Sequence, residues 1–285
     1  MKSFMEYSER NDDFYMAVAE MAMDMFNRQM GTDFSHENVE VCLITEEDAD
    51  EKIPAFLENY KESIEPEMLT PGYVCTICAE AFVTEERKGV LIRTDLGLHD
   101  MEWRHTFLHE LSHIFCTLNE LDNQEEFYSK YCIDYAGSTI QDGAINAGYA
   151  IWREFISEFL ATVLDEDMLD NHLDQMYEHC NFMLDEIESM VDDDKMCVSA
   201  ILVDLMTSIE VFETENSEQL KEVLAAYDRI LASKSLMKLV QIVFEHIKFE
   251  ELWVIDVDFI ESIGNAFLSF KTEIMAKKMG INYDV

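Results

Sequence analysis

Proline is missing from most of this chain, and no other feature of the sequence constrains the fold as much. Pro54, Pro66 and Pro71 all lie in the first quarter, and residues 72–285 contain none. Proline ends or kinks a helix because it has no backbone N–H and its ring clashes with the preceding turn. Glycine is also rare, so little interrupts long helices. From Glu102 onward apolar residues recur every three or four positions, which predicts one helix after another.

The residues before Glu102 are expected to mix helices with strands. Helical periodicity covers 11–29 and 51–63, and the first of these helices stops at Gly31. Runs of β-branched and aromatic residues predict three strands, at 39–44, 73–83 and 90–95. A short polar loop joins the last two, so we expect a hairpin, which the first strand could extend into a small antiparallel or mixed sheet. The predicted fold class is α+β, predominantly α, with the sheet ahead of a helical C-terminal portion.

The chain has 285 residues, enough for one large domain or two small ones. We expect two portions, 1–170 with the small sheet and 171–285 with helices only, packed on each other as one compact unit. Helical periodicity in the second portion is clearest at 220–231 and 236–247. The densest acidic stretch, 165–194, contains interspersed Leu and Met, so we interpret it as an exposed helix face.

The acidic excess is large: 20 Lys and Arg residues against 60 Asp and Glu residues give a net charge of −40. Such a surface repels nucleic acid and anionic membranes and attracts basic partners. Two interpretations remain open, a set of solvated helix faces or a field that steers a basic partner. No stretch is apolar over the length needed to cross a bilayer. The sequence therefore predicts neither direct nucleic-acid binding nor membrane insertion.

Cysteine usage points to a reducing compartment. The seven cysteines, an odd number, are scattered along the chain and form a poor disulfide framework. The first fifteen residues are too polar for the apolar core of a signal peptide, so we expect a cytoplasmic protein. Cys75 and Cys78 have CxxC spacing, but a zinc site of this type needs a second such pair, which the chain lacks.

The stretch TFLHELSHIF, residues 106–115, contains the pattern HExxH in His109, Glu110 and His113. Residues four apart lie on one helix face about a turn apart, so both imidazoles can reach one metal ion. The two histidines point away from the apolar stripe of this helix. That stripe comprises Trp103, Phe107, Leu111, Ile114 and Leu118. A core histidine would lie beside such a stripe, so this pair is predicted to face something else.

A catalytic zinc ion takes three protein ligands and keeps a position for water. The extended pattern in which glycine and a third histidine follow HExxH is absent, because Cys116 and Asn119 occupy those positions. A glutamate from a later helix is the remaining common option. The helix predicted at 146–164 has one face where two carboxylates accompany small residues, namely Glu154, Ser157, Glu158 and Ala161. This face suits close packing against a metal-bearing helix; the alternative is a solvated acidic face.

The element Glu154-Phe-Ile-Ser157-Glu158 resembles the E-x-x-S-D element of thermolysin-like zinc peptidases. The chain therefore resembles a zincin metallopeptidase of the gluzincin type. In those enzymes the glutamate is the third zinc ligand, and the aspartate bonds the first histidine of HExxH. The resemblance implies that Glu154 binds zinc and that Glu158 orients His109. Two departures are Glu in place of Asp at position 158 and a different interval between the two motifs.

The run 90–113, in which a strand precedes the HExxH helix, also resembles the small cytoplasmic ImmA/IrrE-type metallopeptidases. Their E-A-N-x-F-A element has only a faint counterpart in SEFLAT, residues 157–162. The two resemblances together cover residues 90–164. Both imply a zincin-like core with Zn²⁺ as the cofactor.

These residues predict a zinc-dependent metalloprotease that hydrolyses peptide bonds of an intracellular protein or peptide. Glu110 would act as general base on the attacking water, and the metal would polarise the scissile carbonyl. A peptide substrate, basic if the acidic field steers it, could add to the sheet edge near 90–95. Two alternatives of other classes remain: a non-catalytic binding protein on a zincin scaffold, and an acidic inhibitor or DNA mimic. Candidates for an oxyanion donor are Tyr135, Tyr149, His172 and His179.

Overall fold

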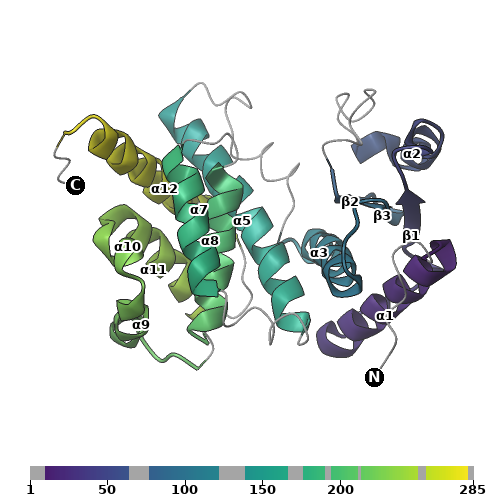
Figure 1. Cartoon of the computed structure of the whole chain (residues 1–285), viewed down its shortest axis with the longest axis horizontal. Coiled ribbons are helices and arrows are strands. Elements are labelled where there is room, and N and C mark those ends of the chain that lie inside the picture. Colours follow the sequence, from purple (N-terminus) through teal and green to yellow (C-terminus); the bar gives the residue numbers. More distant parts are fainter. Residues whose placement is uncertain are drawn as a thin grey trace. The chain divides into compact units, whose positions relative to one another are not determined.

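The computed structural model describes seven stretches of the chain, and in them helices predominate over a single three-stranded sheet (Figure 1). This composition confirms the predicted class, α+β and predominantly α. The described stretches are residues 10–63, 77–121, 139–165, 176–189, 194–210, 213–249 and 255–281.

The chain divides into two compact units. Met1–Thr117 and Leu160–Asp170 form the first, which we call the sheet unit. Leu118–Phe159 and Asn171–Val285 form the second, the helical unit. The long helix α5 (Ile140–Leu164) is shared, since its last turn belongs to the sheet unit. The sequence boundary near residue 170 stays a prediction.

The sheet unit is built around strands β1 (Glu40–Ile44), β2 (Ala79–Val83) and β3 (Lys88–Arg93). Their order is β1-β3-β2, with β1 parallel and β2 antiparallel to β3. The predicted hairpin and the mixed sheet are confirmed. The predicted sheet edge near 90–95 is wrong, because β3 is paired on both sides and the edges are β1 and β2. The run Val90–Ile92 is fully buried, as a central strand covered on both faces requires.

The two faces of the sheet pack against different helices. Helices α1 (Asp12–Met30) and α3 (Asp100–Leu118) share one apolar cluster with Val90 and Ile92. Helix α2 (Ala49–Leu57) shares another cluster with Leu91. Successive strand side chains point to opposite faces, so one buried strand supplies both clusters.

Local sequence signals set the ends of the first helix. Asn11 caps α1 by accepting a hydrogen bond from the backbone N–H of Phe14, and Gly31 ends it with a left-handed φ of 70°. The helix predicted at 51–63 is α2 followed by a 3₁₀ segment, Glu58–Ser63, because Tyr60 has non-helical φ and ψ.

The helical unit contains most of α5 and six further α-helices among the described residues. They are α7 (Met176–Ser189), α8 (Asp194–Ser208), α9 (Ser217–Val223), α10 (Asp228–Ala232), α11 (Lys234–Phe249) and α12 (Val257–Lys278). Helix α7 packs on α8, and α11 packs on α12. The helix predicted at 236–247 is confirmed as part of α11. The single helix predicted at 220–231 is wrong, because a 3₁₀ turn and Tyr227 (φ −101°, ψ 64°) separate α9 from α10.

Two glycines allow α5 and α12 to cross at close range. A Cβ on Gly148 would lie 2.0 Å from the carbonyl oxygen of Ile260, and a Cβ on Gly264 would lie 1.7 Å from that of Ala144. Any side chain at either position would therefore collide with backbone. Glycine at both positions lets the two helix backbones touch.

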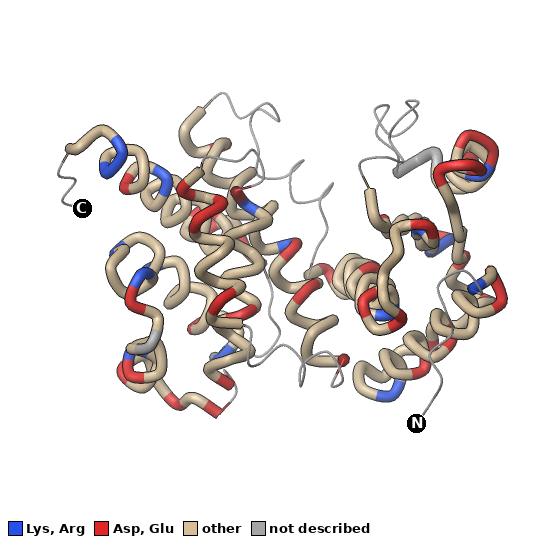
Figure 2. The backbone as a smooth tube through the Cα atoms, in the orientation of Figure 1, with Lys and Arg blue, Asp and Glu red and all other residues tan. Residues whose placement is uncertain are grey.

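Acidic side chains are spread over the helices of both units rather than gathered in one stripe (Figure 2). The exposed acidic face predicted over 165–194 is present on α7, where Glu178 and Asp185 are exposed. The prediction is wrong at both ends of the stretch, since Asp165 and Asp194 are buried, and residues 166–175 and 190–193 lie outside the described residues. The two buried aspartates have cationic partners, Arg104 and Lys271 respectively. Within the described stretches, none of the helices combines the length and the apolar character that a membrane span requires.

Candidate metal centre

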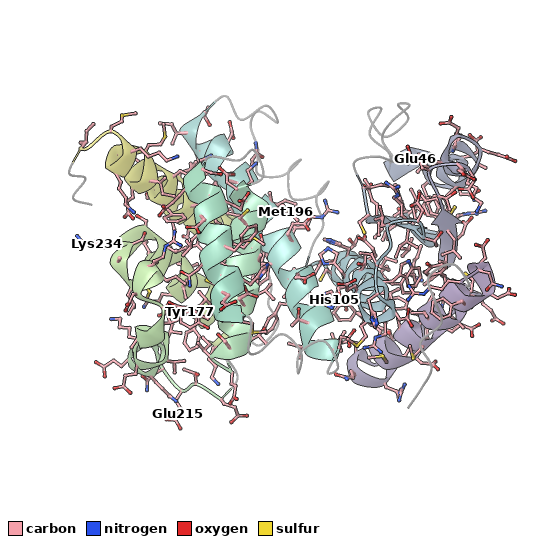
Figure 3. The ribbon with its side chains drawn as sticks, viewed as in Figure 1. Glu46, His105, Tyr177, Met196, Glu215 and Lys234 are labelled. Carbon is pink, nitrogen blue, oxygen red and sulfur yellow. The ribbon has the colours of Figure 1, made fainter. Side chains whose placement is uncertain are left out.

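Helix α3 carries the HExxH residues, and ten of its nineteen residues are buried. Four of the five predicted stripe residues are fully or almost fully buried. The fifth, Leu118, is 48% exposed, because it is the last residue of the helix. Glu110, Ser112, His113 and Cys116 are buried as well, whereas His109 and His105 keep partial exposure. His105 is labelled in Figure 3. The face of α3 that bears the histidines is therefore buried toward its C-terminal end and partly exposed toward its N-terminal end.

The two histidines converge on one point. Their Nε2 atoms are 3.0 Å apart, and the rings meet edge to face at 81°. Two imidazole ligands of a tetrahedral zinc ion have nitrogens about 3.3 Å apart, given Zn–N bonds of about 2.05 Å. Without an ion, the same approach is a hydrogen bond in which one ring N–H donates to the other nitrogen. The spacing predicted from the sequence has thus brought both Nε2 atoms to the distance that a shared ion needs.

Glu154 of α5 completes a group of three ligand-type side chains. The ligand atoms of His109, His113 and Glu154 all lie within 4.8 Å of one another. Among the residues that the structure describes, these three come together in this way. Two imidazoles and one carboxylate form a donor set that catalytic zinc sites use. The residues present therefore fit a zinc ion.

A buried ion pair holds the end of α5 against the start of α3. The Nε atom of Arg104 donates to Asp165 Oδ2 at 3.0 Å, and Nη2 donates to the other carboxylate oxygen. Both side chains are buried. Ala161 and Leu164, in the last turn of α5, lie in the apolar cluster of the sheet unit. A buried, bidentate arginine–carboxylate pair fixes geometry as well as distance.

Glu154 and the end of α5 that contacts α3 lie on one continuous helix. Glu154 precedes Asp165 by eleven residues, about 16 Å along an α-helix.

Sequence reasoning missed the pair formed by Arg104 and Asp165, although one signal was available. Arg104, Leu108 and Leu111 share a helix face, since they are spaced by four and three residues. An arginine on an apolar helix face is rarely buried without a carboxylate partner. The face of Arg104 could therefore have predicted such a partner, though not which of the acidic residues supplies it.

The face of α5 that bears Glu154 is packed rather than solvated. Ser157 and Ala161 are completely buried, and Glu154 and Glu158 are partly exposed beside them. An exposed acidic face would leave the small residues in water. The interpretation of close packing on this face is therefore the better one.

Cys78 places the start of β2 next to the face of α3 that bears Thr106 and His109. Burial is the main cause of its raised thiol pKa; the charge of Glu110 raises it further, while a hydrogen bond with Thr106 and the charge of His109 lower it. These influences act only over short distances. Its CxxC partner, Cys75, lies outside the described residues.

Glu158 lies near a second histidine. His179 of α7 is hydrogen-bonded through Nδ1 to Asp204 Oδ2 at 2.7 Å, and this bond is the main cause of its raised pKa. The negative charge of Glu158 also raises that pKa. Whether Glu158 orients His109 stays a prediction.

The four candidate oxyanion donors differ in whether the structure describes them and in how exposed they are. Tyr135 and His172 lie outside the described residues. Tyr149 is almost completely buried, and His179 is half-exposed with a carboxylate partner. Since Glu158 is one helical turn from Glu154, His179 is the candidate with a described link to the helix that carries Glu154.

Comparison with known proteins adds no family assignment. No family model matches the chain, and neither a curated protein nor a solved structure is similar to it.

Proposed function

We propose that the protein is a zinc-dependent metallopeptidase with a zincin-like core of the gluzincin type. The observation that carries this proposal is the convergence of His109, His113 and Glu154 within 4.8 Å, with Glu110 buried next to the first ligand. Three protein ligands leave a position for water, as catalytic zinc sites require. A purely structural site is closed by four protein ligands and has no use for a base beside it.

Glu110 acts as the general base in the proposed reaction. A bound zinc ion supplies a Lewis acid for the scissile carbonyl and lowers the pKa of a water molecule toward about 7. The carboxylate of Glu110 takes the proton of the attacking water and passes it to the leaving amine. His179, held by Asp204, is our candidate donor to the oxyanion.

The outer edge of β2 is the proposed path of the substrate. The carbonyl of Cys78 accepts a hydrogen bond from the N–H of Arg93, so it faces β3. Backbone groups alternate in direction along a strand, so every second residue from Ala79 faces outward. These residues are Ala79, Ala81 and Val83. An extended peptide can pair with them close to Cys78 and α3, and a net charge of −40 favours a basic peptide.

The metal assignment is tested by zinc content. Purified wild-type protein should carry about one zinc ion per chain, whereas Glu154→Ala should lose most of it. Glu20→Ala, which changes an exposed acidic residue on α1, is the matched control and should bind zinc like wild type. If wild-type protein binds no zinc in zinc-replete buffer, the proposal fails.

The enzyme assignment needs a separate measurement. A library of cellular peptides is incubated with the zinc-loaded protein, and mass spectrometry identifies new termini. Glu110→Gln should keep its zinc and lose cleavage, because the amide cannot accept the proton. Zinc binding without any cleavage by wild type would instead favour a binding protein on this scaffold.

The charge favours one alternative function, an acidic inhibitor or DNA mimic. Its 60 acidic residues include many on helices of both units (Figure 2). Such a protein would bind basic proteins tightly, and salt would weaken the complex. Binding would survive removal of zinc by a chelator. Cleavage that depends on zinc and on Glu110 is not expected under this alternative.

A further inference from the structure

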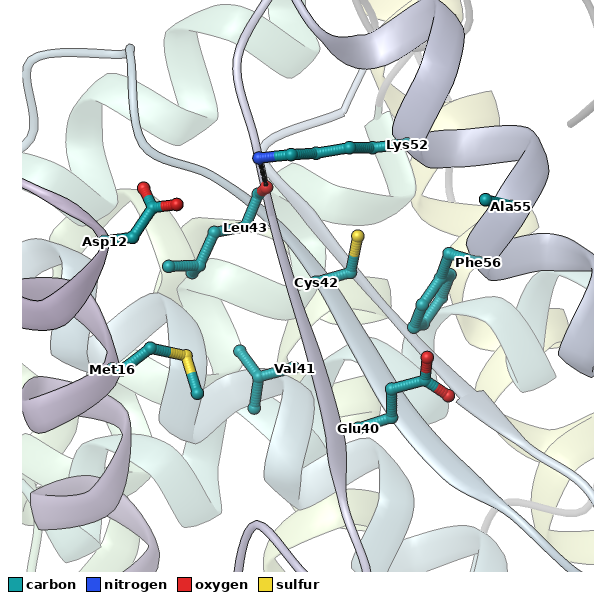
Figure 4. A pocket seen from close by; sticks show the side chains of 9 residues that line it. All are labelled: Asp12, Met16, Glu40, Val41, Cys42, Leu43, Lys52, Ala55 and Phe56. Carbon is teal, nitrogen blue, oxygen red and sulfur yellow. Dashed lines mark hydrogen bonds between the residues drawn. The ribbon is translucent and has the colours of Figure 1, made fainter.

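The strand at the other edge of the sheet, β1, lies at the bottom of an open groove. The groove has a volume of about 420 Å³ and is formed within the sheet unit by α1, β1 and α2 (Figure 4). It lies on the opposite edge of the sheet from β2. Its lining residues are Asp12, Met16, Glu40, Val41, Cys42, Leu43, Lys52, Ala55 and Phe56.

Backbone groups of β1 point into this groove. The carbonyl of Ile44 accepts a hydrogen bond from the N–H of Thr94, so Ile44 faces β3. Because the direction alternates along a strand, Val41 and Leu43 face outward. Lys52 supports this, since its Nζ reaches across from α2 and donates to the Leu43 carbonyl at 2.8 Å.

Three outward groups have no hydrogen-bond partner among the described residues: the N–H and the carbonyl of Val41 and the N–H of Leu43. A sheet edge of this kind is a template for another strand. Natural proteins often cover such an edge with a charged side chain. Here Lys52 covers only the Leu43 end and leaves the rest of the edge open.

The two walls of the groove differ in chemistry. On the α1 side, Asp12 and Met16 stand beside the strand; on the α2 side lie Ala55 and Phe56 (Figure 4). Cys42 also faces the α2 side, where burial raises its pKa to about 11 and keeps the thiol neutral. An extended peptide in the groove would therefore place alternate side chains against the α1 wall, which carries Asp12, and the α2 wall, which carries Ala55 and Phe56.

The charge in the groove is negative. Asp12 and Glu40 are exposed. The only cation among the lining residues is Lys52, which is already paired with Asp48 at 2.7 Å. Two copies of this chain would bring two surfaces of net charge −40 together, so repulsion disfavours a second copy as occupant.

We propose that β1 is a docking site for an extended basic segment of a partner protein, which adds to the sheet as a fourth strand. Backbone hydrogen bonds to Val41 and Leu43 supply affinity. Lys or Arg side chains meet Asp12 on the α1 side, and apolar side chains alternate with them against Ala55 and Phe56 on the α2 side. Glu40, which also lies on the α2 side, adds to the negative charge of the groove. The site uses neither the metal ligands nor β2, so it goes beyond the proposed peptidase function.

The first test uses three labelled synthetic peptides on the full chain with zinc bound. One alternates lysine with valine over ten residues, one has glutamate in place of lysine, and one keeps lysine but is N-methylated at every second backbone nitrogen. Fluorescence anisotropy should show binding of the first peptide and at least about tenfold weaker binding of the others. The methylated peptide keeps its charge, so it separates strand pairing from simple attraction to an acidic protein.

The second test changes the edge itself. Val41→Pro removes an outward N–H and leaves the ladder to β3 intact, a substitution that edge strands tolerate. This variant should bind the lysine peptide at least about tenfold more weakly than wild type, whereas Val41→Thr should bind it with wild-type affinity. Asp12→Asn should weaken binding about two- to fivefold, and the adjacent exposed Asp13→Asn, outside the groove lining, should not.

Three results would overturn the proposal. The methylated peptide could bind as tightly as the unmodified one, which would mean charge attraction alone. Val41→Pro could keep wild-type affinity while circular dichroism shows it folded. Sedimentation could reveal a wild-type dimer that Val41→Pro abolishes, which would make a second copy the occupant. If Val41→Pro does not fold, the affinity of wild-type protein for the methylated peptide tests the proposal instead.

Discussion

Helices α3 and α5 both contribute to the proposed metal centre, but they do so by different means. Helix α3 holds His109, Glu110 and His113 within five consecutive positions, so helix geometry alone brings the two imidazoles together. Helix α5 brings one ligand, Glu154, and its position depends on contacts made elsewhere along the helix. The distance between two ligands on one helix turn is set by helix geometry. The distance to a ligand on a second helix depends on how that helix packs.

The largest expected effect is on the rate of peptide cleavage. It distinguishes the proposed catalytic role of Glu110 on α3 from the proposed zinc-binding role of Glu154 on α5. Glu110→Gln should lower the rate of peptide cleavage by about 10²–10⁴-fold, because general base catalysis is lost. Its zinc content should equal that of wild type. Glu154→Gln should instead lower zinc content, since the amide oxygen is a poorer ligand than a carboxylate. Equal zinc loss in both variants, measured by atomic emission after dialysis, would contradict this division of roles.

The next effect tests whether the buried ion pair positions α5. Arg104→Met leaves the Asp165 carboxylate buried without its partner, which should cost about 3–5 kcal/mol of unfolding free energy. Zinc affinity should fall as well, because α5 loses its anchor. Urea unfolding and competition with a zinc-binding dye measure the two effects.

A double variant distinguishes the lost pair from the unpaired charge. Arg104→Met combined with Asp165→Leu should recover much of the stability, since an apolar pair of similar volume can replace a buried ion pair. If zinc affinity also recovers, apolar packing is enough to position α5. If stability recovers and zinc affinity does not, the bidentate geometry of the ion pair is what places Glu154.

A smaller effect tests the other end of α5. Gly148→Ala should destabilise the helical unit by about 1–3 kcal/mol, because its Cβ would collide with backbone of α12. Gly143→Ala is the matched control on the same helix, where a Cβ meets nothing within 4 Å. It should stabilise the protein by about 0.5–1 kcal/mol through helix propensity. Thermal unfolding of both variants should show shifts of opposite sign.

The smallest effect concerns pH. The pKa of His179 is raised in the fold, chiefly by its hydrogen bond to Asp204, so it stabilises the protein below about pH 6.5, the unfolded value. This stabilisation is lost as the pH rises through the folded pKa. Because the imidazole is half-exposed and screened by solvent, it amounts to less than about 1 kcal/mol. Urea unfolding at pH 5.5 and 8.5 should show it in wild type and not in His179→Gln.

The same histidine can show which residue Glu158 of α5 acts on. Nuclear magnetic resonance of the His179 ring should give a lower pKa in Glu158→Gln than in wild type, since one raising charge is gone. Zinc affinity of the same variant tests the predicted role toward His109. A lower His179 pKa with unchanged zinc affinity would assign Glu158 to His179 alone.

Much of the fold was predictable because the signals were local. Asn11 and Gly31 mark the ends of α1, and a polar loop marks the hairpin. Strand order was not predictable, because hydrophobic runs give strands but not neighbours; the central place of β3 depends on β1 pairing with it in parallel. The break at Tyr227 was missed for a similar reason, since the apolar period continues across it.

The sequence by itself determined the two-histidine unit, because a helix brings residues four apart onto one face wherever it occurs. It also suggested Glu154 as the third ligand, because small residues share its helix face and because the element 154–158 resembles that of thermolysin-like zinc peptidases. Only the tertiary structure decided that Glu154 approaches the histidines, that Arg104 and Asp165 anchor its helix, and that β1 and β2 are the open edges. These features join residues far apart in the chain, and no local pattern specifies which distant partner a side chain or strand meets.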